Sequence, residues 1–334
     1  MNMLLAIDGG STKTISVVFD EEKNEIVSVG LSGSANYTTN SLEFAIKNLS
    51  KSINDAIEAA DITMDSIEKV IVSIVGIGDS EEATKMGNEI ISSLIGKKEY
   101  SVINDGLAAY FLGNGGKNGI VFAPGTGSVG YVKVENRMKR FGGWGWSIGD
   151  MSSATWFSKK SVEIAMMEMD SESSRKPFLE TVENHFKTSL RELSWQIERR
   201  YIQKEKLASF SVNLSRMAKD GNKEALALFD ESASYMGRII NGIRSKYSDA
   251  KRVSIMGGTM QAGEFYYKMI RKYIPDVNIF FGYEIVIGTI MHMENEMDFR
   301  FRDSLLKQLD HSLDKIPEDE LKGYLNIDKP MKLP

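Results

Sequence analysis

The chain has 334 residues, more than a single hydrophobic core usually holds, so two domains are expected, and its net charge of −5 argues against a broad nucleic-acid surface. The absence of cysteine excludes disulfides, cysteine nucleophiles, thiolate-bound zinc and iron–sulfur clusters, and the three histidines are not spaced as metal ligands. We see neither a basic leader nor an apolar run of membrane-spanning length, and therefore expect a cytoplasmic protein without membrane contact.

The first third of the chain has the pattern of a mixed sheet covered by helices. Five segments have the length and apolar pattern of strands: 3–8, 14–20, 25–30, 69–75 and 100–105. The apolar spacing over 42–60 predicts a helix, and a second helix is expected over 81–94. Asn40 followed by Glu43 predicts a capping box at the start of the first helix.

At residue 119 the pattern of strand, glycine–threonine turn and strand starts again, 116 residues after its first occurrence. The segment GIVFAPGTGSVGYVKVE thus repeats the form of LLAIDGGSTKTISVVFD, which predicts an internal duplication into two related domains that face one another. Residues 151–250 are expected to be helical, and their basic cluster RRYIQKEK is interpreted as a solvated helix face. A strand, glycine turn and helix follow from residue 251, and then a charged helical tail.

The first turn, AIDGGSTKT, contains more charged and hydroxyl side chains than a hairpin turn needs. Its two glycines let the backbone approach phosphate oxygens, its hydroxyls can donate hydrogen bonds to them, and Asp8 is placed to hold Mg²⁺ through water. A plain tight hairpin is the alternative, and the second copy of the turn at Thr126 favours phosphate binding.

The second turn matches the dinucleotide fingerprint at Gly125, Gly127 and Gly130, but a strand follows where that fingerprint needs a helix. The Rossmann interpretation therefore fails, and the sequence contains no Walker A loop. A nucleotide would have to be held by two hairpin turns whose N–H groups form anion nests.

Three other motifs suggest a substrate site. Asp105 ends a predicted strand in VINDGLAAYF, where it either caps the next helix or serves as a general base. FGGWGWSIGD is either a buried aromatic turn or a sugar site, with Trp144 as a flat apolar face, Asp150 accepting from hydroxyls and Asn36 adding an amide. The glycines of MGGTM are suited to a purine or ribose lying close to the backbone.

AIDGGSTKT, VINDGLAAY, APGTGSVGYV and GGWGWSIGD, in this order, resemble the BadF/BadG/BcrA/BcrD ATPase family, which includes N-acetylglucosamine kinases. The resemblance covers residue 3 to about residue 290 and implies an α/β protein with two ribonuclease H-like, actin-like ATPase domains, mixed sheets and an interdomain cleft. The implied domains are 1–115 and 116–295, with a charged helical tail at 296–334 that could pack on the first.

The resemblance also implies a set of site residues. Asp105 would be the catalytic base and Asp8 the metal ligand. The residues implied for ATP are Gly9, Gly10, Ser11, Thr12, Lys13, Gly125, Thr126, Gly127, Gly257, Gly258 and Thr259. Those implied for the sugar are Asn36, Asn104, Asp105, Ser128, Gly143, Trp144 and Asp150.

The expected function is transfer of the γ-phosphate of ATP, with Mg²⁺, to a hydroxyl of a sugar-sized substrate. Met151 replaces an acid and Val129 an asparagine of the family pattern, so a sugar acid such as 2-keto-3-deoxygluconate and N-acetylglucosamine or a hexose both stay open. The dehydratase activators of the same family need a cysteine-bound cluster, which this chain cannot hold. A non-catalytic sugar or nucleotide sensor, a filament protein, and an ATPase without a sugar acceptor are the alternatives, and a homodimer is conceivable.

Overall fold

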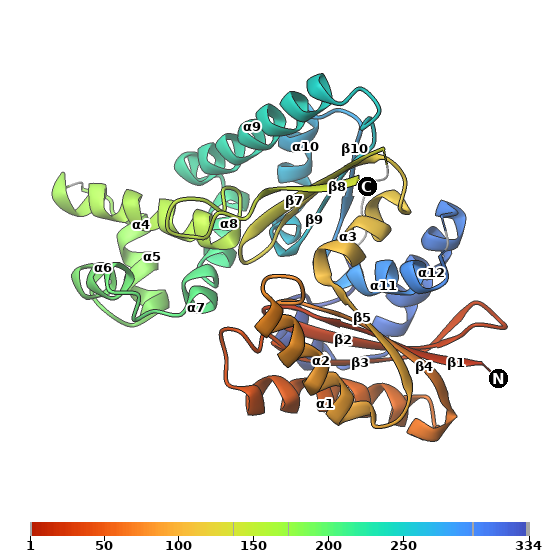
Figure 1. The fold of residues 1–334 in the computed structure, drawn as a ribbon. Coiled ribbons are helices and arrows are strands. Elements are labelled where there is room, and N and C mark those ends of the chain that lie inside the picture. Colours follow the sequence, from red (N-terminus) through yellow and green to blue (C-terminus); the bar gives the residue numbers. More distant parts are fainter. Residues whose placement is uncertain (1, 136, 173, 296, 332–334) are drawn as a thin grey trace. The chain divides into compact units, whose positions relative to one another are not determined.

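The computed structural model describes residues 2–135, 137–172, 174–295 and 297–331, which form two compact units (Figure 1). The first unit contains Met1–Lys117 and Phe281–Pro334, and the second contains Asn118–Phe280. The expected boundaries, which assigned 116–295 to the second domain, therefore differ from these units at residues 116–117 and 281–295. No helix within the described ranges is both long enough and apolar enough to cross a membrane.

The sheet of the first unit has the strand order β3-β2-β1-β4-β5. Its strands are β1 (Met3–Gly9), β2 (Lys13–Asp20), β3 (Glu25–Gly33), β4 (Ile67–Ile74) and β5 (Glu99–Asn104). The first three form antiparallel hairpins, whereas β4 is parallel to β1 and β5 is parallel to β4. Since parallel strands need a crossover, α1 (Leu42–Ala59) and α2 (Glu81–Ile95) connect them and pack on one face.

Small side chains let α1 lie close to β2 and β3. A Cβ on Gly30 would collide with the backbone carbonyl of Ser52 in α1. The hydroxyls of Ser16 and Ser52 are 2.7 Å apart, and that of Ser28 donates to the Ala56 carbonyl at 2.5 Å. The helix begins after Ser41, whose side chain accepts from the Phe44 amide, so the capping box expected from Asn40 is wrong.

The C-terminal segment returns to the first unit. The helix α11 (Ile285–Met293) packs against α3 (Asp105–Asn114) and contacts β1. The next helix, α12 (Phe299–Leu313), lies along β3, where the side chain of Gln308 accepts from the Ile26 amide at 2.8 Å. This packing is the reason why residues 281–295 belong to the first unit and not to the second.

The sheet of the second unit repeats the topology of the first. Its order is β10-β9-β6-β7-β8. When β6 to β10 are matched in chain order with β1 to β5, this is the order of the first sheet read from the opposite edge. The strands are β6 (Gly119–Pro124), β7 (Ser128–Val134), β8 (Arg137–Gly142), β9 (Val253–Met256) and β10 (Val277–Phe280). The pattern of antiparallel and parallel pairs is also the same, which agrees with the expected duplication.

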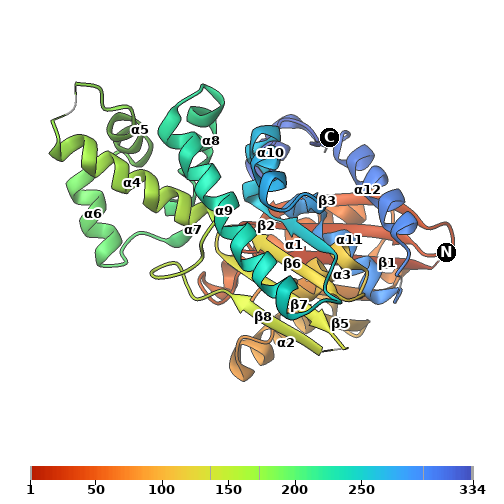
Figure 2. The same ribbon diagram turned by 90° about the horizontal axis from the view of Figure 1, so that it is seen from above.

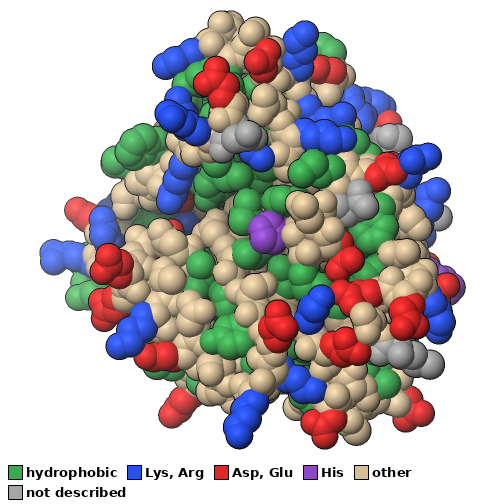
Figure 3. All heavy atoms as spheres, turned by 45° about the vertical axis from the view of Figure 1, so that its right-hand side comes forward, with side chains coloured by type: hydrophobic (Ala, Val, Ile, Leu, Met, Phe, Trp, Pro, Cys, Tyr) green, Lys and Arg blue, Asp and Glu red, His purple; other side chains and the backbone are tan. Residues whose placement is uncertain are grey.

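Helices occupy the interval between β8 and β9, as the sequence predicts. They are α4 (Ala154–Asp170), α5 (Pro177–Phe186), α6 (Leu190–Glu198), α7 (Lys204–Ala208), α8 (Ser211–Lys219) and α9 (Lys223–Lys246). Figure 2 shows α4, α5 and α6 extending away from the strands of their own sheet, whereas α9 packs on α10 (Glu264–Tyr273). On the face drawn in Figure 3, basic and acidic side chains are interspersed, as the small net charge leads one to expect.

Candidate functional site

The first glycine turn joins β1 to β2 and is tightly closed. The Gly10 amide donates to the Lys13 carbonyl at 2.9 Å, and the carbonyls of Gly9 and Gly10 accept from the amides of Val75 and Ala35. With these carbonyls engaged inside the protein, the outer side of the turn carries the half-buried Ser11 and the exposed Thr12. The turn thus presents hydroxyl groups on a backbone that its neighbours hold in place.

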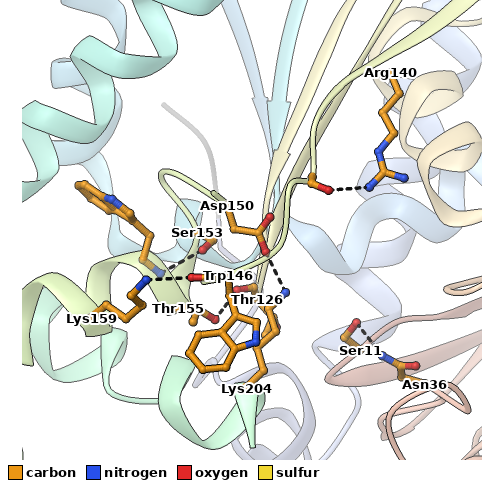
Figure 4. Close-up of polar contacts among 12 residues, drawn as sticks. Ser11, Asn36, Thr126, Arg140, Trp146, Asp150, Ser153, Thr155, Lys159 and Lys204 are labelled. Carbon is orange, nitrogen blue, oxygen red and sulfur yellow. Dashed lines mark hydrogen bonds and ion pairs between the residues drawn. The ribbon is translucent and has the colours of Figure 1, made fainter. Parts of the chain in front are cut away.

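Asn36, which the sequence analysis assigns to the substrate site, lies beside this turn. Its side chain is 5% exposed, and its amide group donates to the Ser11 hydroxyl at 3.4 Å (Figure 4). Its carbonyl oxygen accepts from the amide and the hydroxyl of Thr38 at 3.0 and 2.7 Å. These bonds fix the orientation of the amide, so that its nitrogen is the atom directed to the turn.

Asp8, the only acidic residue of β1, is buried and interacts electrostatically with other groups of the candidate site. Burial raises the pKa of its carboxyl to about 7, a hydrogen bond from Ser73 at 2.5 Å lowers it, the charge of Asp105 raises it, and Lys13 lowers it. Burial likewise lowers the pKa of Lys13 to about 8, against the charges of Asp8 and Glu284. The first unit therefore brings together Asp8, Lys13 and Asp105, which are 97 residues apart at most.

The donor set around Asp8 fits Mg²⁺. Within the described residues no cluster of three or more histidine, cysteine or acidic side chains could enclose a metal. Mg²⁺ does not need such a cluster, because it is usually held by one or two carboxylates, water and substrate phosphates. Asp8 supplies such a carboxylate, and a cation would favour its ionised form.

Asp105 is the first residue of α3, and not the last residue of a strand as the sequence suggests. The side chains of Asn104 and Asp105 both accept from the Gly106 amide, at 2.8 and 2.9 Å, while the Asn104 amide group donates to the Ile77 carbonyl at 2.6 Å. Asn104 is therefore the N-cap of the helix, and Asp105 is its first residue. Because a helix N-terminus favours negative charge and Asp105 is only half-buried, its carboxylate is placed to contact a ligand.

The second glycine turn joins β6 to β7 and is held by the start of α4. The Gly125 amide donates to the Gly127 carbonyl at 2.8 Å, which closes the turn. The Thr126 carbonyl accepts from the Thr155 hydroxyl at 2.7 Å, and the Gly125 carbonyl accepts from the Ala154 amide at 2.9 Å. Like its counterpart in the first unit, this turn has its carbonyls bonded inward.

The segment Gly257–Thr259 lies directly against the second turn. The Thr259 hydroxyl donates to the Pro124 carbonyl at 2.6 Å. Gly257 has a φ of +145°, and a Cβ there would collide with the same carbonyl, so only glycine fits. Two motifs that are more than 130 residues apart are thus neighbours in the second unit.

The GGWGWSIGD segment also reaches the second turn through its last residue. Asp150 is 5% exposed, has a φ of +50° and forms an ion pair of 2.9 Å with the Nζ of Lys204 in α7 (Figure 4). A Cβ on Gly127 would lie 2.7 Å from the Asp150 Oδ2. Trp144 is 76% exposed, which leaves its ring accessible, and the Gly143 carbonyl accepts from Arg140. Ser128, the remaining predicted contact, is buried at the start of β7.

Lys204 is the functional candidate that the sequence analysis missed. It belongs to the cluster RRYIQKEK, which was expected to be a solvated helix face, and this interpretation is wrong for Lys204. The sequence around Lys204 contains no pattern that indicates its partner Asp150, which lies 54 positions earlier.

Comparisons with known proteins agree with the resemblance seen in the motifs. The model of the BadF/BadG/BcrA/BcrD ATPase family matches residues 5–290. An N-acetylmuramic acid/N-acetylglucosamine kinase of Clostridium acetobutylicum is 26% identical over 171 residues, which are 51% of this chain and 55% of that protein. The chain thus matches about half the length of that relative. An N-acetyl-D-glucosamine kinase of Dictyostelium discoideum is 25% identical over 256 residues, 73% of this chain and 80% of that protein.

Solved structures confirm the fold class. A candidate N-acetylglucosamine kinase of Porphyromonas gingivalis has a TM-score of 0.67 at 15% identity, covering 88% of this chain and 99% of that one. A ROK family glucokinase of Streptomyces griseus, in complex with glucose and AMPPNP, has a TM-score of 0.56 at 16% identity, covering 86% and 98%. The α/β fold with two mixed sheets is therefore that of the actin-like ATPases.

Proposed function

Since the chain belongs to the BadF/BadG/BcrA/BcrD ATPase family, we propose that it is an ATP-dependent kinase of N-acetylated amino sugars, N-acetylglucosamine in particular. The names of both curated relatives include N-acetylglucosamine, which favours an amino sugar over 2-keto-3-deoxygluconate. The observation that carries the proposal is the gathering of Asp8, Lys13 and Asp105 beside the first glycine turn.

In this proposal the two glycine turns bind the phosphates of ATP. Each turn has carbonyls bonded inward, so that amides and the hydroxyls of Ser11, Thr12 and Thr126 can donate to phosphate oxygens. Gly257–Thr259 would contact the nucleoside, because its glycines allow a flat ring to lie close to the backbone. Asp8 would hold Mg²⁺, which supplies charge neutralisation for the phosphates when bound.

The acceptor would be oriented by Asp105. Its carboxylate accepts the hydrogen bond of the sugar hydroxyl and takes the proton as the oxygen bonds to the γ-phosphorus and the bond to the ADP oxygen breaks. Asn36 and Asp150, both buried and held by hydrogen bonds, would contact the other polar groups of the sugar. Gly143, Trp144 and Ser128 would complete the set, with the exposed Trp144 ring as an apolar face.

The test is ADP release from ATP with N-acetylglucosamine, N-acetylmuramic acid, glucosamine, glucose, gluconate and 2-keto-3-deoxygluconate as acceptors. We expect release that depends on an N-acetylated amino sugar. Release without any acceptor would support an ATPase, and binding without release would support a sensor. Either result would overturn the proposal.

Asp105→Asn tests the assigned base. The asparagine can still accept from the Gly106 amide, so the fold should persist, whereas kcat should fall at least about 100-fold with the sugar KM within several-fold of the wild type. Asp65→Asn, which removes the same charge at an exposed site of the same unit, is the matched control and should leave kcat unchanged. Near-normal turnover of Asp105→Asn would remove this residue from the mechanism.

A further inference from the structure

Lys204 lies over the second glycine turn, although the sequence places it at the start of a short helix in the helical region. A Cβ on Gly127 would lie only 2.5 Å from its Nζ, so the ammonium group rests against the backbone of the turn. The same Nζ donates to the Asp150 Oδ2 at 2.9 Å, and the Lys204 side chain is 29% exposed. Figure 4 shows these side chains directed toward one another.

The ammonium group occupies space that a side chain at position 127 would need. Gly127 is not among the glycines with positive φ, so its backbone conformation does not require glycine. Its Cβ position instead falls between the Lys204 Nζ and the Asp150 Oδ2, both closer than a real Cβ contact allows. The absence of a side chain at residue 127 therefore leaves room for a cation against the turn.

A purely structural ion pair would be a different explanation of the same contact. Such a pair holds two segments together and needs no particular neighbour. Here the cation lies against the second glycine turn, which suits phosphate binding. The neighbouring segment Gly257–Thr259 suits a nucleoside. An ammonium group has three N–H donors, and the bond to Asp150 engages one of them. The other two can donate to an oxyanion placed on the turn.

We propose that Lys204 is a catalytic residue that binds the phosphoryl group during its transfer. This inference rests on the proposed kinase function. As the γ-phosphorus bonds to the sugar oxygen and its bond to the ADP oxygen breaks, negative charge is spread over its three outer oxygens, and Lys204 donates hydrogen bonds to them. The proton of the hydroxyl goes to Asp105. Asp150 fixes the ammonium group in position.

The test compares Lys204→Met, Lys204→Arg and Lys206→Met. Lys206 is exposed on the same short helix and is the matched control for the loss of one charge. Removal of one donor to a developing oxyanion costs about 100- to 1,000-fold in kcat, so we expect that loss for Lys204→Met, partial recovery with arginine and wild-type turnover for Lys206→Met. A kcat of Lys204→Met within about 3-fold of the wild type would overturn the proposal.

A second measurement separates catalysis from a structural role. ADP with aluminium fluoride mimics the transferring phosphoryl group, and its affinity should fall about 100-fold in Lys204→Met while that of ADP alone stays within several-fold. Equal losses for both ligands, or an unchanged affinity for the mimic, would refute the role. This binding assay needs no sugar, so a wild-type protein without acceptor-dependent turnover would refute the kinase function and still test Lys204.

Discussion

At Gly288 in α11, one added methyl group should markedly lower the free energy of unfolding of the first unit, by an amount that can be calculated from the structure. A Cβ there would collide with the carbonyl oxygen of Ala108 and would lie 2.9 Å from its carbonyl carbon and 2.8 Å from the Leu112 amide nitrogen. All three atoms belong to the backbone of α3, so no side-chain rotation can relieve the contact. Gly288→Ala must therefore push two packed helices apart.

The change in the free energy of unfolding is the sum of two opposing effects, overpacking of the core and the higher helix propensity of alanine. Overpacking a core usually costs about 1–3 kcal/mol, and contact with backbone atoms places this site at the upper end of that range. Alanine is better than glycine in a helix by about 1 kcal/mol, which offsets part of the cost. We expect the free energy of unfolding of the first unit to fall by roughly 2 kcal/mol, which corresponds to a Tm lower by about 4–8 °C.

Urea and thermal denaturation measure this change. Gly242→Ala is the control, because Gly242 is exposed in α9 and its added Cβ would have no atom within 4 Å. The control should be more stable than the wild type by up to about 1 kcal/mol. A Gly288→Ala protein as stable as the wild type would show that α3 and α11 can separate at little cost, which would refute the reasoning.

Two further predictions concern Glu284 and Thr259. Burial raises the pKa of Glu284 from 4.5 to about 8, so the folded protein keeps a proton that the unfolded chain loses, and stability should fall with rising pH between these values by about 1.4 kcal/mol per unit. Glu284→Gln, which can still accept from the Phe281 amide, should remove the contribution of Glu284 to that slope and leave the contribution of Asp8, whose pKa is raised to about 7; a slope unchanged in urea denaturation at pH 5 to 8 would assign it to other groups. Thr259→Val leaves the buried Pro124 carbonyl without its hydroxyl donor, which should cost about 1–3 kcal/mol and raise the KM for ATP but not for the sugar. An equal rise in both KM values would contradict the assignment of this segment to the nucleoside.

The local elements of this protein follow from its sequence because their signals are local. Apolar periodicity correctly predicts β1, β2, β4, α1 and α2, and the repeated turn correctly predicts two sheets of the same construction. The candidate residues beside the glycine turns can be predicted for the same reason, because glycines and hydroxyl side chains together at a strand end are uncommon. The pairing of Asn36 with Ser11 joins two of these predicted residues.

The missed features depend on neighbours that are remote in the chain. The short strands β8 and β10 carry little periodicity of their own and are strands because β7 and β9 pair with them. Ser73 and Lys204 look like ordinary polar residues until the fold places them beside Asp8 and Asp150.

The sequence by itself thus determined β1, β2, β4, α1 and α2, the duplication and the family, because each depends on short-range patterns of residue type. The tertiary structure decided which unit receives residues 281–334, and which charged side chains are buried and paired. Burial and charge pairing depend on which segments the fold brings close together. The free-energy cost of removing a charge from water therefore depends on its surroundings and not only on the residue type.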